Sequence, residues 1–271
     1  MKNPTSPYLP DLKEAWTLVL VLLLGGGLLQ GIFNALLQGL GWTHALLTKA
    51  LSYGVLFVPL FLYLAHRTGG RLPDSGSLSP KRPPLAHYLL LLVMVPATSL
   101  LCEPLLMWIP TPDWFIRLME SMTRGNLWVT LLSVAVLAPL LEEFLCRGLI
   151  LRGLLAHTSP ARAIMWSSLI FALIHLNPWQ AIPAFVLGSL FGWVYYRTGN
   201  LWTTVFMHSL NNSLSVLLQR WLPDYTATTP LYELFPWHPA LTLIAAAGLL
   251  LACLAILQHT TEPSFTKHHE D

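Results

Sequence analysis

Charged residues are scarce in this sequence. Only 10% of its 271 residues are Asp, Glu, Lys or Arg, whereas 54% are hydrophobic. A typical soluble domain carries about 25% charged residues, since long charged side chains supply much of the surface that faces water. The small charged share therefore excludes an ordinary water-soluble domain and indicates a protein surrounded by lipid.

Several other features are absent. The three cysteines, Cys102, Cys146 and Cys253, lie in apolar runs without metal-ligand spacing, which is typical of packing residues. The sequence contains no internal repeat, no glycine-rich phosphate loop and no basic patch of the kind that binds nucleic acid. We therefore expect one transmembrane domain over residues 1–271, with the lipid bilayer as a partner and no nucleic acid.

The sequence contains many long apolar runs. A bilayer core about 30 Å thick is crossed by a helix of roughly 20 apolar residues. By that measure the fold class is an all-α polytopic membrane protein with about eight transmembrane helices. The eight segments are Trp16–Leu40, Leu46–Ala65, Ala86–Ile109, Leu127–Leu145, Ala163–Leu176, Trp179–Tyr196, Leu201–Leu222 and Ala240–Leu257.

The basic residues are distributed unevenly between the two ends of these segments. With both termini in the cytoplasm, 11 of the 15 Lys and Arg residues fall inside. Only Lys49, Arg117, Arg124 and Arg220 fall outside. Because cytoplasmic loops are enriched in Lys and Arg, this partition predicts that the N- and C-termini are both cytoplasmic.

Ionisable side chains within a membrane span cost about 2.5–3.5 kcal/mol each on insertion scales and usually face a protein interior or a wet cavity. Such groups cluster in three consecutive motifs, and the first contains Glu142-Glu143, which follows Pro139 in the fourth segment. Glu143 and Arg147 are four residues apart and can pair on one helix face, whereas Glu142 points about 100° away. Taken alone, the motif is equally compatible with an ion pair that anchors the end of a helix.

Two further polar motifs follow in the fifth and seventh segments. His175 stands near the end of an apolar helix, where backbone hydrogen-bond partners are available. His208 and Asn212 are four residues apart and therefore share a helix face. Each motif alone also fits a structural role, because polar side chains hydrogen-bond between membrane helices.

Together the motifs supply a carboxylate, two imidazoles and a carboxamide. Glu142 or His175 could take a proton from water, while His208 and Asn212 could donate hydrogen bonds to a developing oxyanion. The same residue types also form zinc sites, in which case Glu142, His175 and His208 would be the ligands. We favour a site without a cofactor, with zinc as the open alternative.

In this order and on three helices, the motifs resemble the CPBP family, which includes the type II CAAX prenyl endopeptidases and bacteriocin-processing and immunity proteins. The family's Glu-Glu-x-x-x-Arg matches Glu142, Glu143 and Arg147. Its Phe-x-x-x-His matches Phe171 and His175, and its His-x-x-x-Asn matches His208 and Asn212. The resemblance covers a catalytic core over residues 127–222.

The resemblance implies an eight-helix fold with a cavity open toward the cytoplasm. It also implies an intramembrane endopeptidase in which a water activated by Glu142 and His175 cleaves a peptide bond, without a metal in the mechanism that we favour. His208 and Asn212 would form the oxyanion site, and Glu143, Arg147 and Phe171 would support it.

The expected substrate is a membrane-associated peptide or protein, and the expected location is the bacterial cytoplasmic membrane, with the site in its cytoplasmic half. One alternative is a non-enzymatic immunity or scaffold protein that uses the same polar cluster for binding. Another is a small transporter with a Glu/His proton relay, although no inverted repeat supports it.

Overall fold

The computed structural model describes residues 8–42, 45–71, 78–79, 82–123, 125–222 and 230–265. This described part of the chain is helical and contains no β-strand. Five of its helical segments are long and apolar enough to cross a membrane: Leu12–Gly39, Leu47–Thr68, Leu85–Leu106, Leu127–His157 and Pro239–Thr260. The expected all-α membrane protein is confirmed.

Each of the eight predicted segments is helical, but three of them are not among these five candidate spans. Helix α10 (Pro160–Leu173) is apolar but short. Helices α11 (Pro178–Thr198) and α12 (Leu201–Trp221) have 21 residues each. Polar side chains, among them His208 and Asn212 in α12, reduce the apolar character that a lipid-facing span requires.

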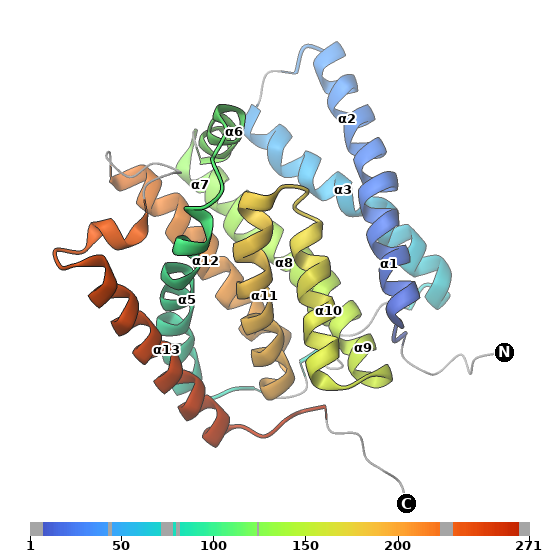
Figure 1. Ribbon diagram of the computed structural model, residues 1–271. Coiled ribbons are helices and arrows are strands. Elements are labelled where there is room, and N and C mark those ends of the chain that lie inside the picture. Colours follow the sequence, from blue (N-terminus) through green and yellow to red (C-terminus); the bar gives the residue numbers. More distant parts are fainter. Residues whose placement is uncertain are drawn as a thin grey trace, which may run out of the picture.

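The first two spans form an antiparallel pair. Helix α1 (Leu12–Leu20), π-helix η1 (Val21–Gly26) and helix α2 (Gly27–Gly39) follow one another without a break, and α3 (Ala45–Thr68) returns beside them (Figure 1). The two helices cross closely at Gly26, because a Cβ atom built there would lie 2.1 Å from the Leu56 carbonyl oxygen. A larger residue would therefore force the pair apart.

The fourth predicted segment continues well beyond its expected end at Leu145. It runs through α7 (Leu127–Thr130), η2 (Leu131–Leu137), α8 (Ala138–Glu143), η3 (Phe144–Leu151) and α9 (Arg152–His157). The elements η2 and η3 are π-helical, and π-helical turns inside α-helices are frequent at functional sites. Glu142 lies midway along this 31-residue segment.

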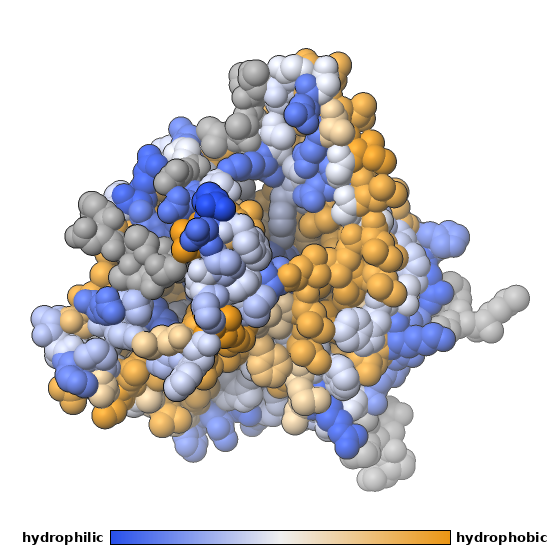
Figure 2. All heavy atoms as spheres, turned by 45° about the horizontal axis from the view of Figure 1, so that its top comes forward, coloured by the Kyte–Doolittle hydropathy of each residue, from blue (hydrophilic) through white to orange (hydrophobic). Residues whose placement is uncertain are grey.

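The remaining elements complete the bundle. Helix α5 (Leu85–Leu106) leads to the short helix α6 (Asp113–Thr123), and the 3₁₀ turn η4 (Leu231–Leu234) precedes α13 (Pro239–Thr260), which packs against α5. Large apolar side chains lie exposed on the outer surface, including Leu24, Leu62 and Ile244. Figure 2 shows extensive hydrophobic areas on one such face, as a lipid-embedded protein requires.

Successive long helices alternate in direction, so the bundle has two ends. The beginning of α1 and the end of α13 lie at the same end (Figure 1). Two hydrogen bonds tie this end together: the His157 ring donates to the Leu9 carbonyl at 3.1 Å, and the Ser264 amide donates to the Tyr196 carbonyl at 2.9 Å. We call this end the terminal face.

Candidate active site

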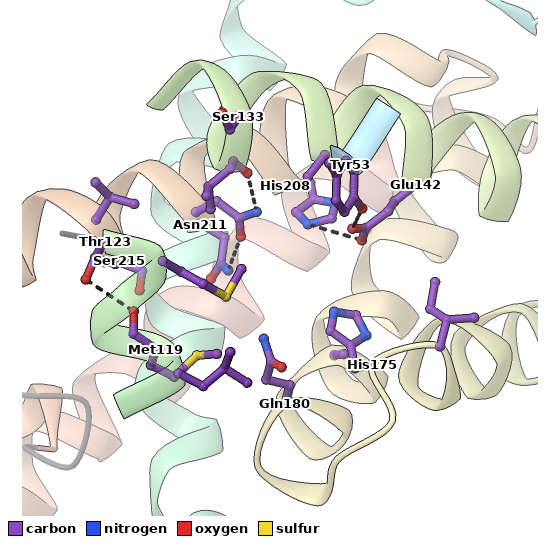
Figure 3. Close-up of a pocket in the computed structure, with 18 of the residues that line it drawn as sticks. Tyr53, Met119, Thr123, Ser133, Glu142, His175, Gln180, His208, Asn211 and Ser215 are labelled. Carbon is purple, nitrogen blue, oxygen red and sulfur yellow. Dashed lines mark hydrogen bonds and ion pairs between the residues drawn. The ribbon is translucent and has the colours of Figure 1, made fainter. Parts of the chain in front are cut away.

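Four side chains singled out in the sequence line one cavity of about 770 Å³: Glu142, His175, His208 and Asn212. They come from α8, from the turn after α10 and from α12. In Figure 3, Glu142 and His208 lie on one side of the cavity and His175 lies across from them. The structure thus brings together polar groups that are far apart in the sequence.

Glu143 and Arg147 do not line this cavity but form the buried support behind it. Arg147 Nη1 donates to Glu143 Oε1 at 2.8 Å, and both side chains are fully buried. The same carboxylate oxygen accepts a hydrogen bond from His208 Nδ1 at 2.9 Å. Glu143 therefore fixes the ring of His208 while its own charge is balanced by Arg147.

Further contacts hold the Arg147 guanidinium in place. Its Nη2 donates to the Gly188 carbonyl at 2.8 Å, and its Cζ lies 4.5 Å from the centroid of the Phe171 ring. A Cβ atom at Gly188 would lie 3.2 Å from Nη2, so the glycine gives the guanidinium room. Phe171 is thus placed as a cation–π partner of Arg147 and an edge-on neighbour of the His208 ring.

Glu142 points into the cavity instead of toward Arg147. Its Oε1 accepts a hydrogen bond from the Tyr53 hydroxyl of α3. Its Oε2 lies 3.9 Å from His208 Nε2, which is too long for a hydrogen bond, and within the described residues it has no hydrogen-bond partner. One oxygen of Glu142 is therefore anchored, and the other is available to a polar group in the cavity.

His175 lies outside the helix in which the sequence places it. Helix α10 ends at Leu173, and His175 occupies the following turn, before Asn177 caps α11. Its Nδ1 is 2.8 Å from the Phe171 carbonyl oxygen. A carbonyl only accepts hydrogen bonds, so Nδ1 carries the proton, and in a neutral ring Nε2 is left as an acceptor. This tautomer suits a proton acceptor.

The Asn212 amide is partly engaged. Its Nδ2 donates to the Val134 carbonyl at 2.8 Å, and its Oδ1 accepts from Asn211 Nδ2 at 3.2 Å. A primary amide has two N–H donors, so with respect to the described residues the second N–H can bind an oxyanion. The contact with Val134, in η2, also fixes the orientation of the amide.

Tyr53 is the main residue of the site that the sequence did not indicate. It lies 89 positions before Glu142, in a helix that no motif marks. Gln180 and Asn211 also line the cavity without belonging to a motif position (Figure 3). The available signal was only a polar residue within an apolar segment, which is too common to identify a site.

A zinc ion would need at least three ligand side chains that converge on one point. Among the residues that the structure describes, no group of three or more His, Cys, Asp or Glu side chains is placed to hold a metal ion. The possible zinc set of Glu142, His175 and His208 is therefore not assembled in this conformation, although all three side chains line the cavity.

The segment that contains Glu142, His175, His208 and Asn212 is similar to known proteins. Residues 124–214 match the family model of the Rce1-like type II CAAX prenyl endopeptidases. This match covers about a third of the chain and confirms the resemblance drawn from the three motifs. No solved structure gives a significant match.

Three bacterial proteins are similar over part of their length. The membrane-embedded CAAX protease MroQ of Staphylococcus aureus is 34% identical over 98 residues, 34% of this chain and 39% of its own. YdiL of Bacillus subtilis, named as a candidate membrane peptidase, is 29% identical over 85 residues, 31% of this chain and 35% of its own. The UPF0177 protein YxdF of Lactococcus lactis is 31% identical over 80 residues, 29% of this chain and 44% of its own. The matches therefore span less than half of each relative.

Proposed function

We propose that this chain is an intramembrane endopeptidase that hydrolyses a peptide bond in a membrane-associated peptide or protein. The observation that carries the proposal is the single cavity into which Glu142, His175, His208 and Asn212 all project. The family match of residues 124–214 supports it.

In this proposal a water molecule binds between Glu142 Oε2 and His175 Nε2, the two acceptors described above. One of them takes a proton as the water oxygen attacks the carbonyl carbon of the scissile peptide bond. The proton then passes to the amide nitrogen, the C–N bond breaks, and a carboxylic acid and an amine leave. Tyr53 holds the other oxygen of Glu142 and so keeps Oε2 directed into the cavity.

The tetrahedral intermediate carries a negative oxygen, which His208 and Asn212 stabilise. His208 Nδ1 already donates to Glu143, so a protonated ring presents a second N–H at Nε2. Together with the second N–H of Asn212, this gives the two donors of an oxyanion site.

The test compares the peptides released from membranes that contain the wild-type protein with those released when Glu142 is replaced by Ala. Glu103→Gln is the matched control, because Glu103 is also a carboxylate within a span, does not line the cavity and accepts a hydrogen bond from the Tyr232 amide. We expect a set of products that disappears in Glu142→Ala and persists in Glu103→Gln. An unchanged product set in correctly inserted Glu142→Ala would refute the proposal.

A further inference from the structure

The cavity opens at the end of the bundle opposite the terminal face. Its lining includes Lys49, Tyr53 and Leu56 from the first half of α3, and Val129 and Ser133 from the beginning of the α7–α9 segment. These parts of α3 and of the α7–α9 segment lie at the end of the bundle opposite the beginning of α1 and the end of α13 (Figure 1). We call this end the open face.

The short helix α6 forms part of the rim on the open face. It follows the end of α5 and precedes the beginning of α7, and Leu118, Met119 and Met122 contribute to the cavity wall. Hydrogen bonds join this region to its neighbours: Lys49 Nζ donates to the Ser121 carbonyl, Trp179 Nε1 to the Pro110 carbonyl at 3.1 Å, and the Thr123 hydroxyl to Gln219 Oε1 at 3.0 Å. Figure 2, in which the top of Figure 1 comes forward, shows the surface hollowed on this face.

Basic residues are concentrated at the terminal face. Arg147 is fully buried against Glu143, so its charge belongs to neither face. Among the other described residues, the basic side chains toward the terminal face are Lys13, Arg67, Arg71, Arg82, Arg152, Arg162 and Arg197. Those toward the open face are Lys49, Arg117 and Arg220. Lys and Arg accumulate on the cytoplasmic side of membrane proteins, so this excess of seven over three places the terminal face in the cytoplasm.

We infer that the cavity opens to the extracytoplasmic side of the membrane, so that its substrates are peptide segments that have already crossed the bilayer. Cytoplasmic termini and a cavity open toward the cytoplasm were both expected from the sequence, and the structure shows that they exclude one another. Of these two expectations we keep the cytoplasmic termini, because they rest on the basic residues of this chain. The cytoplasmic opening was implied only by the family resemblance. The orientation stands independently of catalysis, and the substrate class rests on the proposed function.

The wall of the cavity indicates which segments it accepts. Phe115, Leu118, Met119 and Met122 from α6 and Trp179 from α11 give the rim an apolar surface. Polar side chains interrupt this surface, among them Lys49, Thr123 and Gln219, and the carboxylate of Glu142 lies deeper, midway along its helix. An extracytoplasmic stretch of a membrane-anchored peptide, which carries both apolar and polar side chains at the membrane surface, matches this mixed lining.

Orientation is tested by cysteine labelling in intact cells with a membrane-impermeant maleimide. Asp113→Cys places a thiol on the open face, and Ala161→Cys places one on the terminal face; both positions are exposed, and neither change alters the number of basic residues. The parent chain is the control, since Cys102, Cys146 and Cys253 are buried. We expect labelling of Asp113→Cys in intact cells and of Ala161→Cys only after permeabilisation. The reverse pattern would overturn the inference.

A second experiment tests the substrate class. Termini of membrane proteins that appear with the wild type and not with Glu142→Ala are mapped onto the topology of the proteins cleaved. We expect them in extracytoplasmic segments, and their location in cytoplasmic segments would contradict the substrate class. If no such termini exist, the proposed protease function and this substrate class both fail, while the labelling result still decides the orientation.

Discussion

Tyr53→Phe removes a single hydroxyl from the candidate site. That hydroxyl donates to Glu142 Oε1, and the ring also packs against Phe57 with centroids 5.7 Å apart. Phenylalanine retains the ring, so the packing in α3 is preserved. The change therefore isolates the hydrogen bond that orients the Glu142 carboxylate.

The expected magnitude follows from the charge of the acceptor. A hydrogen bond to a charged group contributes roughly 1.5–3 kcal/mol, and about 1.4 kcal/mol corresponds to a factor of ten in rate. If most of that energy holds Oε2 in its reactive direction, Tyr53→Phe lowers kcat by roughly 10- to 100-fold. KM stays near the wild-type value, because Tyr53 acts on Glu142 and not directly on the peptide.

The assay measures kcat and KM for a membrane peptide in proteoliposomes, beside the thermal unfolding of each variant. Tyr63→Phe, in the same helix but outside the cavity, is the matched control and is expected to leave kcat unchanged. A fully active Tyr53→Phe variant would refute the orienting role. So would a variant whose lost activity simply follows a lower unfolding temperature.

Three further predictions concern the buried ion pair of Glu143, the helix crossing at Gly26 and the zinc alternative. Glu143→Gln leaves a buried guanidinium without its counter-charge, so we expect a loss of about 3–5 kcal/mol in unfolding free energy; wild-type stability in a detergent unfolding assay would contradict this role. Gly26→Ala brings a Cβ against the Leu56 carbonyl and should cost about 1–3 kcal/mol, whereas Gly27→Ala, which meets no atom within 4 Å, should be nearly neutral in the same assay. A zinc chelator should leave the cleavage rate of the purified protein unchanged, and a loss of activity that added zinc restores would support the zinc alternative instead.

The sequence predicted the membrane class and the residues that meet in the cavity for clear physical reasons. Apolar runs of span length report burial in lipid directly. An ionisable residue in such a run must find a cavity or a partner, which is why Glu142, His175 and His208 could be recognised. The i to i+4 spacing of Glu143 and Arg147 likewise predicted the ion pair that the structure shows.

Other features depend on tertiary contacts that no local pattern records. The bond between Tyr53 and Glu142 joins helices 89 residues apart. The end of α10 at Leu173 is set by the turn that carries His175 and by the capping of α11 by Asn177, which the continuous apolar pattern hides. The direction in which the cavity opens depends on how all the helices pack, and hydropathy contains no information about it.

The central claim is that Glu142 activates the water that cleaves the peptide bond. Its most direct test is the cleavage rate of a membrane peptide in proteoliposomes that contain either purified wild type or purified Glu142→Gln, a change that keeps a hydrogen-bond acceptor for Tyr53. The account predicts that Glu142→Gln unfolds at the wild-type temperature but cleaves roughly 10²- to 10⁴-fold more slowly, which is the range for loss of a general base. Cleavage at the wild-type rate by the folded variant would contradict it.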